Sequence, residues 1–186
     1  LKKGKGGRTC CGSGSGNMKS IYLNYNNQRY LRLDFQTEHV ANVLGVPELG
    51  KYIQSERQRF QFKMCLDPEN AAHQMMIDKF MAFDTFFQRA AAPALLSMGD
   101  GVPTYHPILK EWENRDGKVK YIVKLRIGST PEGKPDVKVT QTKNERRHVP
   151  CDDIDAVSRQ VTRGSEVRAL WNFSRLWVKV QGSLVE

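Results

Sequence analysis

The feature that most constrains the fold is the segment KVKYIVKLRI at residues 118–127, in which cationic and apolar side chains alternate. Neighbouring side chains of a strand point to opposite faces, so a period of two puts one set on each face, and only Ile122 interrupts it. The apolar set is Val119, Tyr121, Val123, Leu125 and Ile127, and the cationic set is Lys118, Lys120, Lys124 and Arg126. The pattern predicts a strand with one face on a core and a row of like charges on the other. Such a row either faces a polyanion or is simply solvated.

Length and charge narrow the class of protein. A chain of 186 residues suits one domain with a substantial core better than two small ones. Its net charge of +9 favours nucleic acid as a partner first and an anionic membrane surface second. No apolar run is long enough to span a bilayer, and the N-terminus does not resemble a signal peptide. We therefore expect an intracellular protein.

The cysteines predict free thiols rather than a disulfide framework or a metal site. Cys10, Cys11, Cys65 and Cys151 form no CxxC pair, which is typical of a reducing compartment. The only metal-like fragment is 148–151, HVPC, and no second ligand pair lies near it in the sequence. We expect no metal.

The first 18 residues predict a flexible arm. They contain four cations, no acid and many glycines, so they cannot bury apolar area. The remaining residues, 19–186, are predicted to form a single domain. The arm could contact neighbouring subunits of a homo-oligomer or larger assembly.

Periodicity predicts the elements of this domain. Strands are expected at 20–25, 29–36, 58–66, 119–127, 136–142, 165–173 and 175–181, the last two joined tightly around 172–174. A long amphipathic helix is expected over 68–90, with Asp67 as N-cap and an end before Pro93. A shorter helix is expected at 152–162, and a loop at 94–117.

Catalytic patterns are weak. Asp152, Asp153 and Asp155 are explained by capping of the shorter helix. The four histidines are scattered, and His73 is expected at the surface. No nucleophile, dinucleotide or metalloprotease motif occurs. We therefore expect a protein without catalytic activity or cofactor.

The outward faces of the predicted strands carry the two parts that hold single-stranded nucleic acid, namely cations for phosphates and rings on which bases stack. The candidate binding residues are Tyr30, Arg32, Arg59, Lys63, Lys120, Lys124, Arg126, Arg168, Trp177 and Lys179. Tyr25 and Trp112 are further aromatic candidates, although each ring could instead pack under a loop. Whether all these positions converge on one surface depends on how the sheet closes.

The order of several segments resembles the OB-fold single-stranded-DNA-binding proteins of large nucleocytoplasmic DNA viruses. The segments are KSIYLNYNNQRYLRLDFQ (19–36), FQFKMCL (60–66), FMAFD (80–84), YHPILKEW (105–112), YIVKLRI (121–127) and VRALWNFSRLWVKVQ (167–181). The resemblance implies that the basic face comprises Lys120, Lys124, Arg126, Arg168 and Lys179. The tail and the loop around 99–103 depart from the family pattern.

The expected fold is therefore α+β, an OB-like antiparallel β-barrel or curled sheet of five to six strands packed by one long amphipathic helix. The expected function is non-catalytic, sequence-tolerant binding of single-stranded DNA in viral replication, recombination or repair, in the host cytoplasm or nucleus. A structural component of a virion, an enzyme with an unrecognised motif, and binding of RNA or duplex DNA remain alternatives, because phosphate attraction is common to all nucleic acids.

Overall fold

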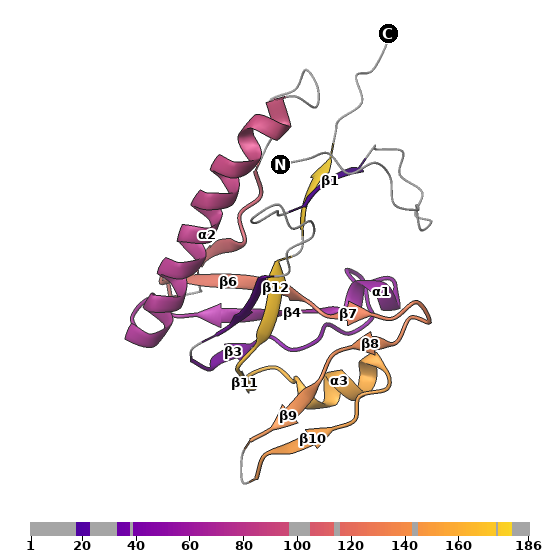
Figure 1. Cartoon of the computed structure of the whole chain (residues 1–186). Coiled ribbons are helices and arrows are strands. Elements are labelled where there is room, and N and C mark those ends of the chain that lie inside the picture. Colours follow the sequence, from indigo (N-terminus) through magenta and orange to yellow (C-terminus); the bar gives the residue numbers. More distant parts are fainter. Residues whose placement is uncertain are drawn as a thin grey trace. The chain divides into compact units, whose positions relative to one another are not determined.

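The computed structural model describes residues 18–22, 33–37, 39–96, 105–113, 116–142, 145–173 and 175–179 (Figure 1). They belong to two compact units. The sheet unit takes its residues from 36–81 and 108–169, and the terminal unit takes its residues from 1–35, 82–107 and 170–186. The predicted arm lies outside the described residues except for Met18. The prediction of a single domain over 19–186 stays a prediction.

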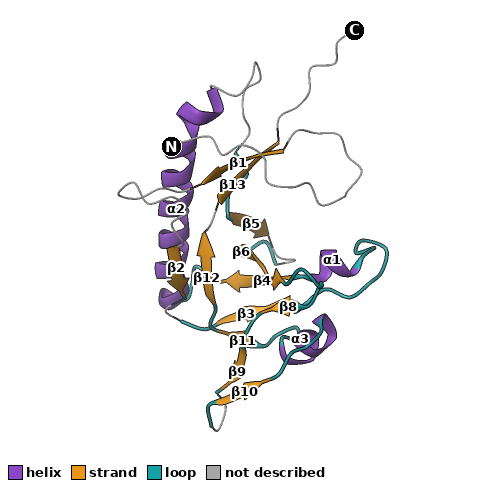
Figure 2. Cartoon of the chain, turned by 45° about the vertical axis from the view of Figure 1, so that its right-hand side comes forward, coloured by secondary structure: helices purple, strands orange, loops and turns teal. Residues whose placement is uncertain are grey.

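The sheet unit is built on a five-stranded antiparallel sheet with the strand order β11-β3-β4-β6-β5 (Figure 2). The strands are β3 (Ala41–Val43), β4 (Gln61–Leu66), β5 (Leu109–Glu113), β6 (Val119–Arg126) and β11 (Glu166–Val167). In the described part of the chain this sheet is not closed into a barrel. The prediction of a mixed α+β fold with an antiparallel sheet is confirmed at that level.

The basic strand predicted at 119–127 is β6, and its phase is the predicted one from Val123 onward, whereas Val119, predicted to face the core, is exposed. Val123 and Leu125 are buried, and Lys124 and Arg126 are exposed. β4 is shorter than predicted because the short helix α1 (Glu56–Arg59) occupies the residues before it. β3 and β5 fall in segments that were predicted to be loops.

Smaller elements extend the sheet unit. β7 (Gly128–Ser129) pairs with β8 (Pro135–Asp136), and β9 (Val139–Gln141) pairs with β10 (Arg147–Val149). The predicted helix at 152–162 is α3 (Ile154–Gln160). Its predicted acidic cap is confirmed, because the Asp153 carboxylate accepts the N–H of Ala156 at 2.6 Å.

The long helix α2 (Ala71–Leu96) starts later and ends later than predicted. Asn70 is the cap, since its side-chain oxygen accepts the N–H groups of Ala72 at 2.9 Å and His73 at 3.4 Å. Asp67 instead closes a turn by accepting the N–H of Glu69 at 3.1 Å. Pro93 lies inside the helix, where proline removes a hydrogen bond without ending the element.

His73 is not at the surface, so that prediction is wrong. Its Nδ1 accepts the N–H of Asp67 at 3.1 Å, and its Nε2 lies 3.1 Å from the carbonyl oxygen of Val40. Because Nδ1 is the acceptor, the hydrogen-bond partners assign the proton to Nε2, which donates to Val40. The ring therefore joins the start of α2 to the chain before β3.

One face of the sheet forms the core of this unit together with α2 and α3. Met76, Ile77 and Phe80 of α2 and Ile154 and Val157 of α3 are all buried. The strands contribute the buried residues Ala41, Val43, Met64, Leu66, Leu109, Val123 and Leu125. The other face of the sheet is thereby left to carry polar and charged side chains.

The terminal unit contains two strand pairs. β1 (Met18–Tyr22) pairs with β13 (Arg175–Lys179), and β2 (Leu33–Gln36) pairs with β12 (Leu170–Phe173). The predicted hairpin between the last two strands is therefore wrong. A tight hairpin needs about two loop residues, and only residue 174 separates β12 from β13.

Aromatic side chains pack together in the terminal unit. Trp171 and Phe173 of β12 have ring centroids 4.6 Å apart, and the ring centroid of Phe173 lies 4.7 Å from that of Phe87 and 5.2 Å from that of Phe83. These edge-to-face contacts confirm the predicted inward stripe of α2 at Phe83 and Phe87. None of the helices in the described residues is long and apolar enough to cross a membrane.

Candidate nucleic-acid interface

The face of the sheet opposite the core gathers cations from three neighbouring strands. Lys63 of β4 lies directly opposite Lys124 of β6, and Arg126 lies opposite Gln61. Lys110 of β5 lies opposite Ile122, on the same face. Lys63, Lys110, Lys124 and Arg126 are all exposed. We call these four residues the cationic cluster.

The side chains of the cluster act on one another electrostatically. Partial burial lowers the pKa of Lys124, and the positive charges of Arg126, Lys63 and Lys110 lower it further. Like charges directly opposite each other on antiparallel strands are destabilising. Within the described residues, no carboxylate forms an ion pair with any member of the cluster. The folded chain thus keeps a repulsive group of charges on one surface.

The other end of β6 is neutralised. Lys118 contacts both carboxylate oxygens of Glu69, at 2.9 and 3.0 Å. Lys120 forms an ion pair with Asp67, and this hydrogen bond is the largest of the influences that together lower the pKa of the Asp67 carboxyl. Lys118 and Lys120 belong to the predicted cationic row, but their charges are already matched within the protein.

An exposed ring accompanies the cluster. Trp112 of β5 is 46% exposed and lies opposite Lys120, two residues from Lys110 on the same face. Its indole is therefore available for stacking. Trp112 was only a secondary aromatic candidate from the sequence, since β5 was not predicted as a strand.

Arg59 does not belong to the outward face, so its predicted position there is wrong. Its side chain is only 7% exposed. The guanidinium donates to Asp155 at 2.6 Å, to Glu56 at 3.0 and 3.3 Å, and to the carbonyl of Pro47 at 3.0 Å. The reason is local: Arg59 lies in α1, so the period of two that holds in β4 does not extend to it.

Of the predicted binding residues not yet described, Arg168 lies in the sheet unit and is not in the cluster. Arg168 is exposed but follows β11, which is separated from β4 by β3. Trp177 and Lys179 lie in β13 of the terminal unit, where they pair with Ser20 and Met18. Tyr25, Tyr30 and Arg32 lie outside the described residues.

Lys110 is the member of the cluster that sequence reasoning missed. It lies in the stretch assigned to a loop, where no side-chain phase could be given. The segment ILKEWE at 108–113 contains a signal, because Lys110 and Trp112 alternate with Leu109. The acids Glu111 and Glu113 obscure that alternation.

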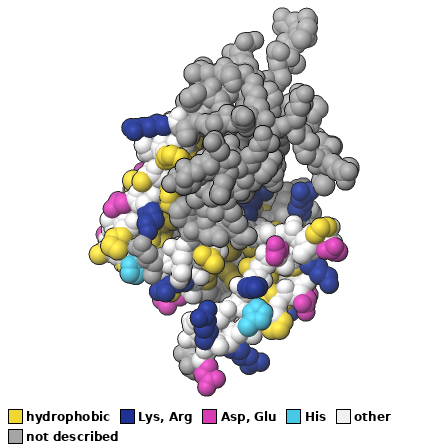
Figure 3. Space-filling model, in the orientation of Figure 1, with side chains coloured by type: hydrophobic (Ala, Val, Ile, Leu, Met, Phe, Trp, Pro, Cys, Tyr) yellow, Lys and Arg dark blue, Asp and Glu magenta, His cyan; other side chains and the backbone are white. Residues whose placement is uncertain are grey.

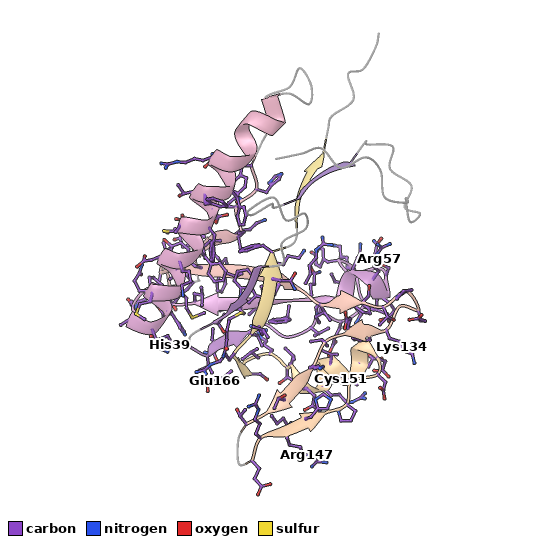
Figure 4. All side chains as sticks on the ribbon, viewed as in Figure 1. His39, Arg57, Lys134, Arg147, Cys151 and Glu166 are labelled. Carbon is purple, nitrogen blue, oxygen red and sulfur yellow. The ribbon has the colours of Figure 1, made fainter. Side chains whose placement is uncertain are left out.

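A second group of cations lies on the β9–β10 hairpin. Lys138, Arg146 and Arg147 are exposed there, with His148 and Glu145 beside them. Figure 3 shows Lys and Arg side chains over this hairpin, at the bottom of the view, and Figure 4 labels Arg147. Among its described residues this group contains an acid, and its one ring is the imidazole of His148, a smaller stacking surface than an indole.

Cys65 lies on the same face as the cluster and is half-buried. Burial raises the pKa of its thiol, and the charges of Lys63 and Arg163 oppose that rise. Cys65 and Cys151 are free thiols, as predicted. Among the residues that the structure describes, no group of three or more His, Cys, Asp or Glu side chains is arranged to hold a metal ion.

No protein-family model matches the chain, and comparison with curated proteins and with solved structures gives no match either. The resemblance to the viral DNA-binding family therefore stays a prediction.

Proposed function

We propose that the chain binds single-stranded DNA without catalysis and without a required base sequence, through the cationic cluster and Trp112. An OB-like closure of the sheet, and a role in viral DNA replication, recombination or repair, belong to the same proposal and rest on the resemblance.

One observation carries this proposal: cations from three adjacent strands share a surface with no carboxylate partner among the described residues. Neighbouring strands lie about 4.8 Å apart and alternate residues of one strand about 7 Å apart, so the four charges form a compact patch. A polyanion on this patch would relieve the repulsion between Lys63 and Lys124. Each phosphate contact would also release counterions.

The exposed indole favours an unpaired strand over a duplex. Phosphate attraction is available to both, but stacking on Trp112 requires a base whose face is free. Single-stranded RNA also has bases with free faces, so it fits the same surface. The ring thus supplies preference for a single strand, and the cations supply affinity.

The test is fluorescence anisotropy with an oligo-dT strand, a duplex and an RNA strand over a series of salt concentrations. If all four cations contact phosphates, the slope of log K against log salt is about −2.8 for a single strand. Lys124→Gln with Arg126→Gln removes two contacts, which makes the slope about 1.4 units shallower and weakens binding about 25-fold near 0.1 M salt.

The chain offers a matched control on the same strand. Lys118→Gln with Lys120→Gln removes the same charge from residues that are already paired with Glu69 and Asp67. We expect this variant to keep the slope, because no phosphate contact is lost, and to lose much less affinity than the cluster variant, through the two carboxylates left unpaired. Equal losses in the two double variants would mean that net charge alone attracts the strand, and would overturn the proposed site.

A further inference from the structure

We propose that Tyr52, together with Lys51, forms a second contact for the same strand, stacking an unpaired base beyond the Arg126 end of the cationic cluster. This inference rests on the proposed function. It adds a site that no candidate residue from the sequence covers.

The first reason is how the turn presents the ring. The N–H of Gly50 donates to the carbonyl of Ile53 at 2.9 Å, and the N–H of Ile53 donates to the carbonyl of Gly50 at 3.2 Å. This reciprocal pair closes a two-residue apex that consists of Lys51 and Tyr52. A closed turn fixes the backbone that carries the ring, so little backbone ordering is needed when a ligand arrives.

The second reason is exposure. Tyr52 is 85% exposed, the highest value among the large hydrophobic side chains of the described residues. A ring so exposed packs against almost nothing in the folded chain, which excludes a core role. Lys51 Nζ lies 5.7 Å from its centroid. A cation close to an exposed ring is the pair of features that holds one nucleotide of a single strand.

The third reason is location. The loop is fixed to α1 at both of its ends, since Arg59 Nε donates to Pro47 at 3.0 Å and the Gln54 N–H donates to Gln58 at 2.7 Å. α1 directly precedes Gln61, the residue opposite Arg126. The turn is therefore attached at the Arg126 end of the sheet and not at the end where Asp67 neutralises Lys120.

Charges of both signs lie near the turn. Arg57, labelled on α1 in Figure 4, is exposed. Of the two acids nearby in sequence, Glu56 is bound by Arg59, and Glu48 is exposed. In the proposed arrangement, a strand that leaves the cluster past Arg126 would meet Lys51 and the ring, and Glu48 would oppose it.

Oligonucleotide length separates this contact from the cluster itself. We would measure anisotropy with oligo-dT strands of about 4 and about 16 nucleotides, which span the usual range of site sizes for one such domain. Tyr52→Ala should weaken binding of the longer strand about 5- to 150-fold, the effect of losing one stacked base. The shorter strand, held by the cluster, should bind as before.

Two substitutions at the same residue test the chemistry. Tyr52→Phe keeps the aromatic face and should bind like the wild-type chain. Tyr52→Leu keeps apolar bulk but no π face, and should behave like the alanine variant. Leu49→Ala is a control in the same loop, at a side chain that is 52% exposed. It should leave the affinity for both oligonucleotides unchanged. Thermal unfolding confirms that each variant is folded.

The outcomes distinguish the two proposals. If the wild-type chain binds neither strand, the proposed function fails. If it binds both and Tyr52→Ala binds both equally well, the proposed function stands and this inference is overturned. If Tyr52→Ala weakens binding of both oligonucleotides equally, Tyr52 contacts the same nucleotides as the cluster. That result would also overturn the inference. A leucine variant that binds like wild type would show an apolar contact instead of stacking.

Discussion

The two ends of β6 carry the same kind of charge in different surroundings. At one end, Lys118 and Lys120 face Glu69 and Asp67, which follow β4 along the chain. At the other end, Lys124 faces Lys63, and Arg126 faces the neutral Gln61. The alternation in the sequence is the same throughout. What separates a structural cation from one available to a ligand is the residue that the register places opposite.

Arg59 is an extreme case of the structural kind, and its substitution should have the largest effect on folding. Arg59→Met keeps an apolar stem but loses the charged hydrogen bonds, so we expect a loss of about 1.5–3 kcal/mol in the free energy of unfolding. The cost stays below that of a fully buried pair because Glu56 and Asp155 remain hydrated. Urea denaturation measures it.

The same variant should leave binding of the short oligonucleotide unchanged, because Arg59 lies outside the cluster. A large loss of that affinity in a folded Arg59→Met protein would contradict the division between structural and available cations.

Asp67→Asn should convert a structural cation into an available one. With the carboxylate gone, Lys120 becomes a fifth free charge on the face, so affinity for oligo-dT should rise about fivefold near 0.1 M salt and the slope should steepen by about 0.7. The amide still accepts the Glu69 N–H. Since Asp67 is partly exposed, the loss in stability should be under about 1 kcal/mol. If Asp67→Asn binds oligo-dT more weakly than the wild-type chain, the division between structural and available cations is contradicted.

Low pH should weaken the Asp67–Lys120 ion pair at the neutralised end of β6 and thereby lower the stability of the folded chain. The pKa of Asp67 is lower in the folded chain than its ordinary value of 3.8, so the unfolded state binds more protons in that range. The stabilisation from the Asp67–Lys120 pair is complete above the ordinary value and is lost as the pH falls through the lowered one. Chemical denaturation between neutral pH and about pH 3 should show this loss in the wild-type chain, and a smaller one in Asp67→Asn.

Lys124→Gln should have the smallest effect on stability, and of opposite sign. Removing one of two facing like charges should raise the free energy of unfolding by a few tenths of a kcal/mol, the scale of cross-strand pairs. Lys118→Gln loses an ion pair and should not stabilise the chain. A destabilised Lys124→Gln protein would mean that the Lys63–Lys124 repulsion is already relieved.

The dependence of stability on alkaline pH is a second test of the effect of the Lys124 charge. Because the pKa of Lys124 is lowered in the folded state, the unfolded chain keeps the proton to higher pH, and stability should rise between the lowered value and 10.5. The free energy of unfolding, measured by chemical denaturation over this pH range, should show this rise in the wild-type chain and not in Lys124→Gln.

The sequence pattern predicted those strands and helices in which apolar residues recur at a regular period. β6, α2 and α3 follow from alternation, from helical spacing and from the acids that cap α3. β3 and β5 were missed because they are short or interrupted by acids, so that pairing with neighbours, rather than their own pattern, makes them strands. The start of α2 was misplaced because Asp67 and Asn70 are both good caps, and Lys120 engages Asp67.

The candidate site could be predicted only in part for the same reason. Phase alone placed Lys63, Lys124 and Arg126 correctly, since each lies well inside a strand. It could not reveal that Asp67 and Glu69 neutralise Lys120 and Lys118, which depends on contacts between distant segments. Nor could it identify Tyr52, whose exposure results from a turn closed by backbone hydrogen bonds.

The open sheet has a consequence for the solubility of the protein. In the described residues β5 is an outer strand, paired only with β6, so its free backbone edge is a template on which a strand of another molecule could add. Lys110, Glu111 and Glu113 are exposed on that strand, and charged side chains of this kind discourage edge-to-edge aggregation. An unpaired sheet edge must be protected against copies of the same protein, and on β5 the acids that obscured the strand in the sequence provide that protection.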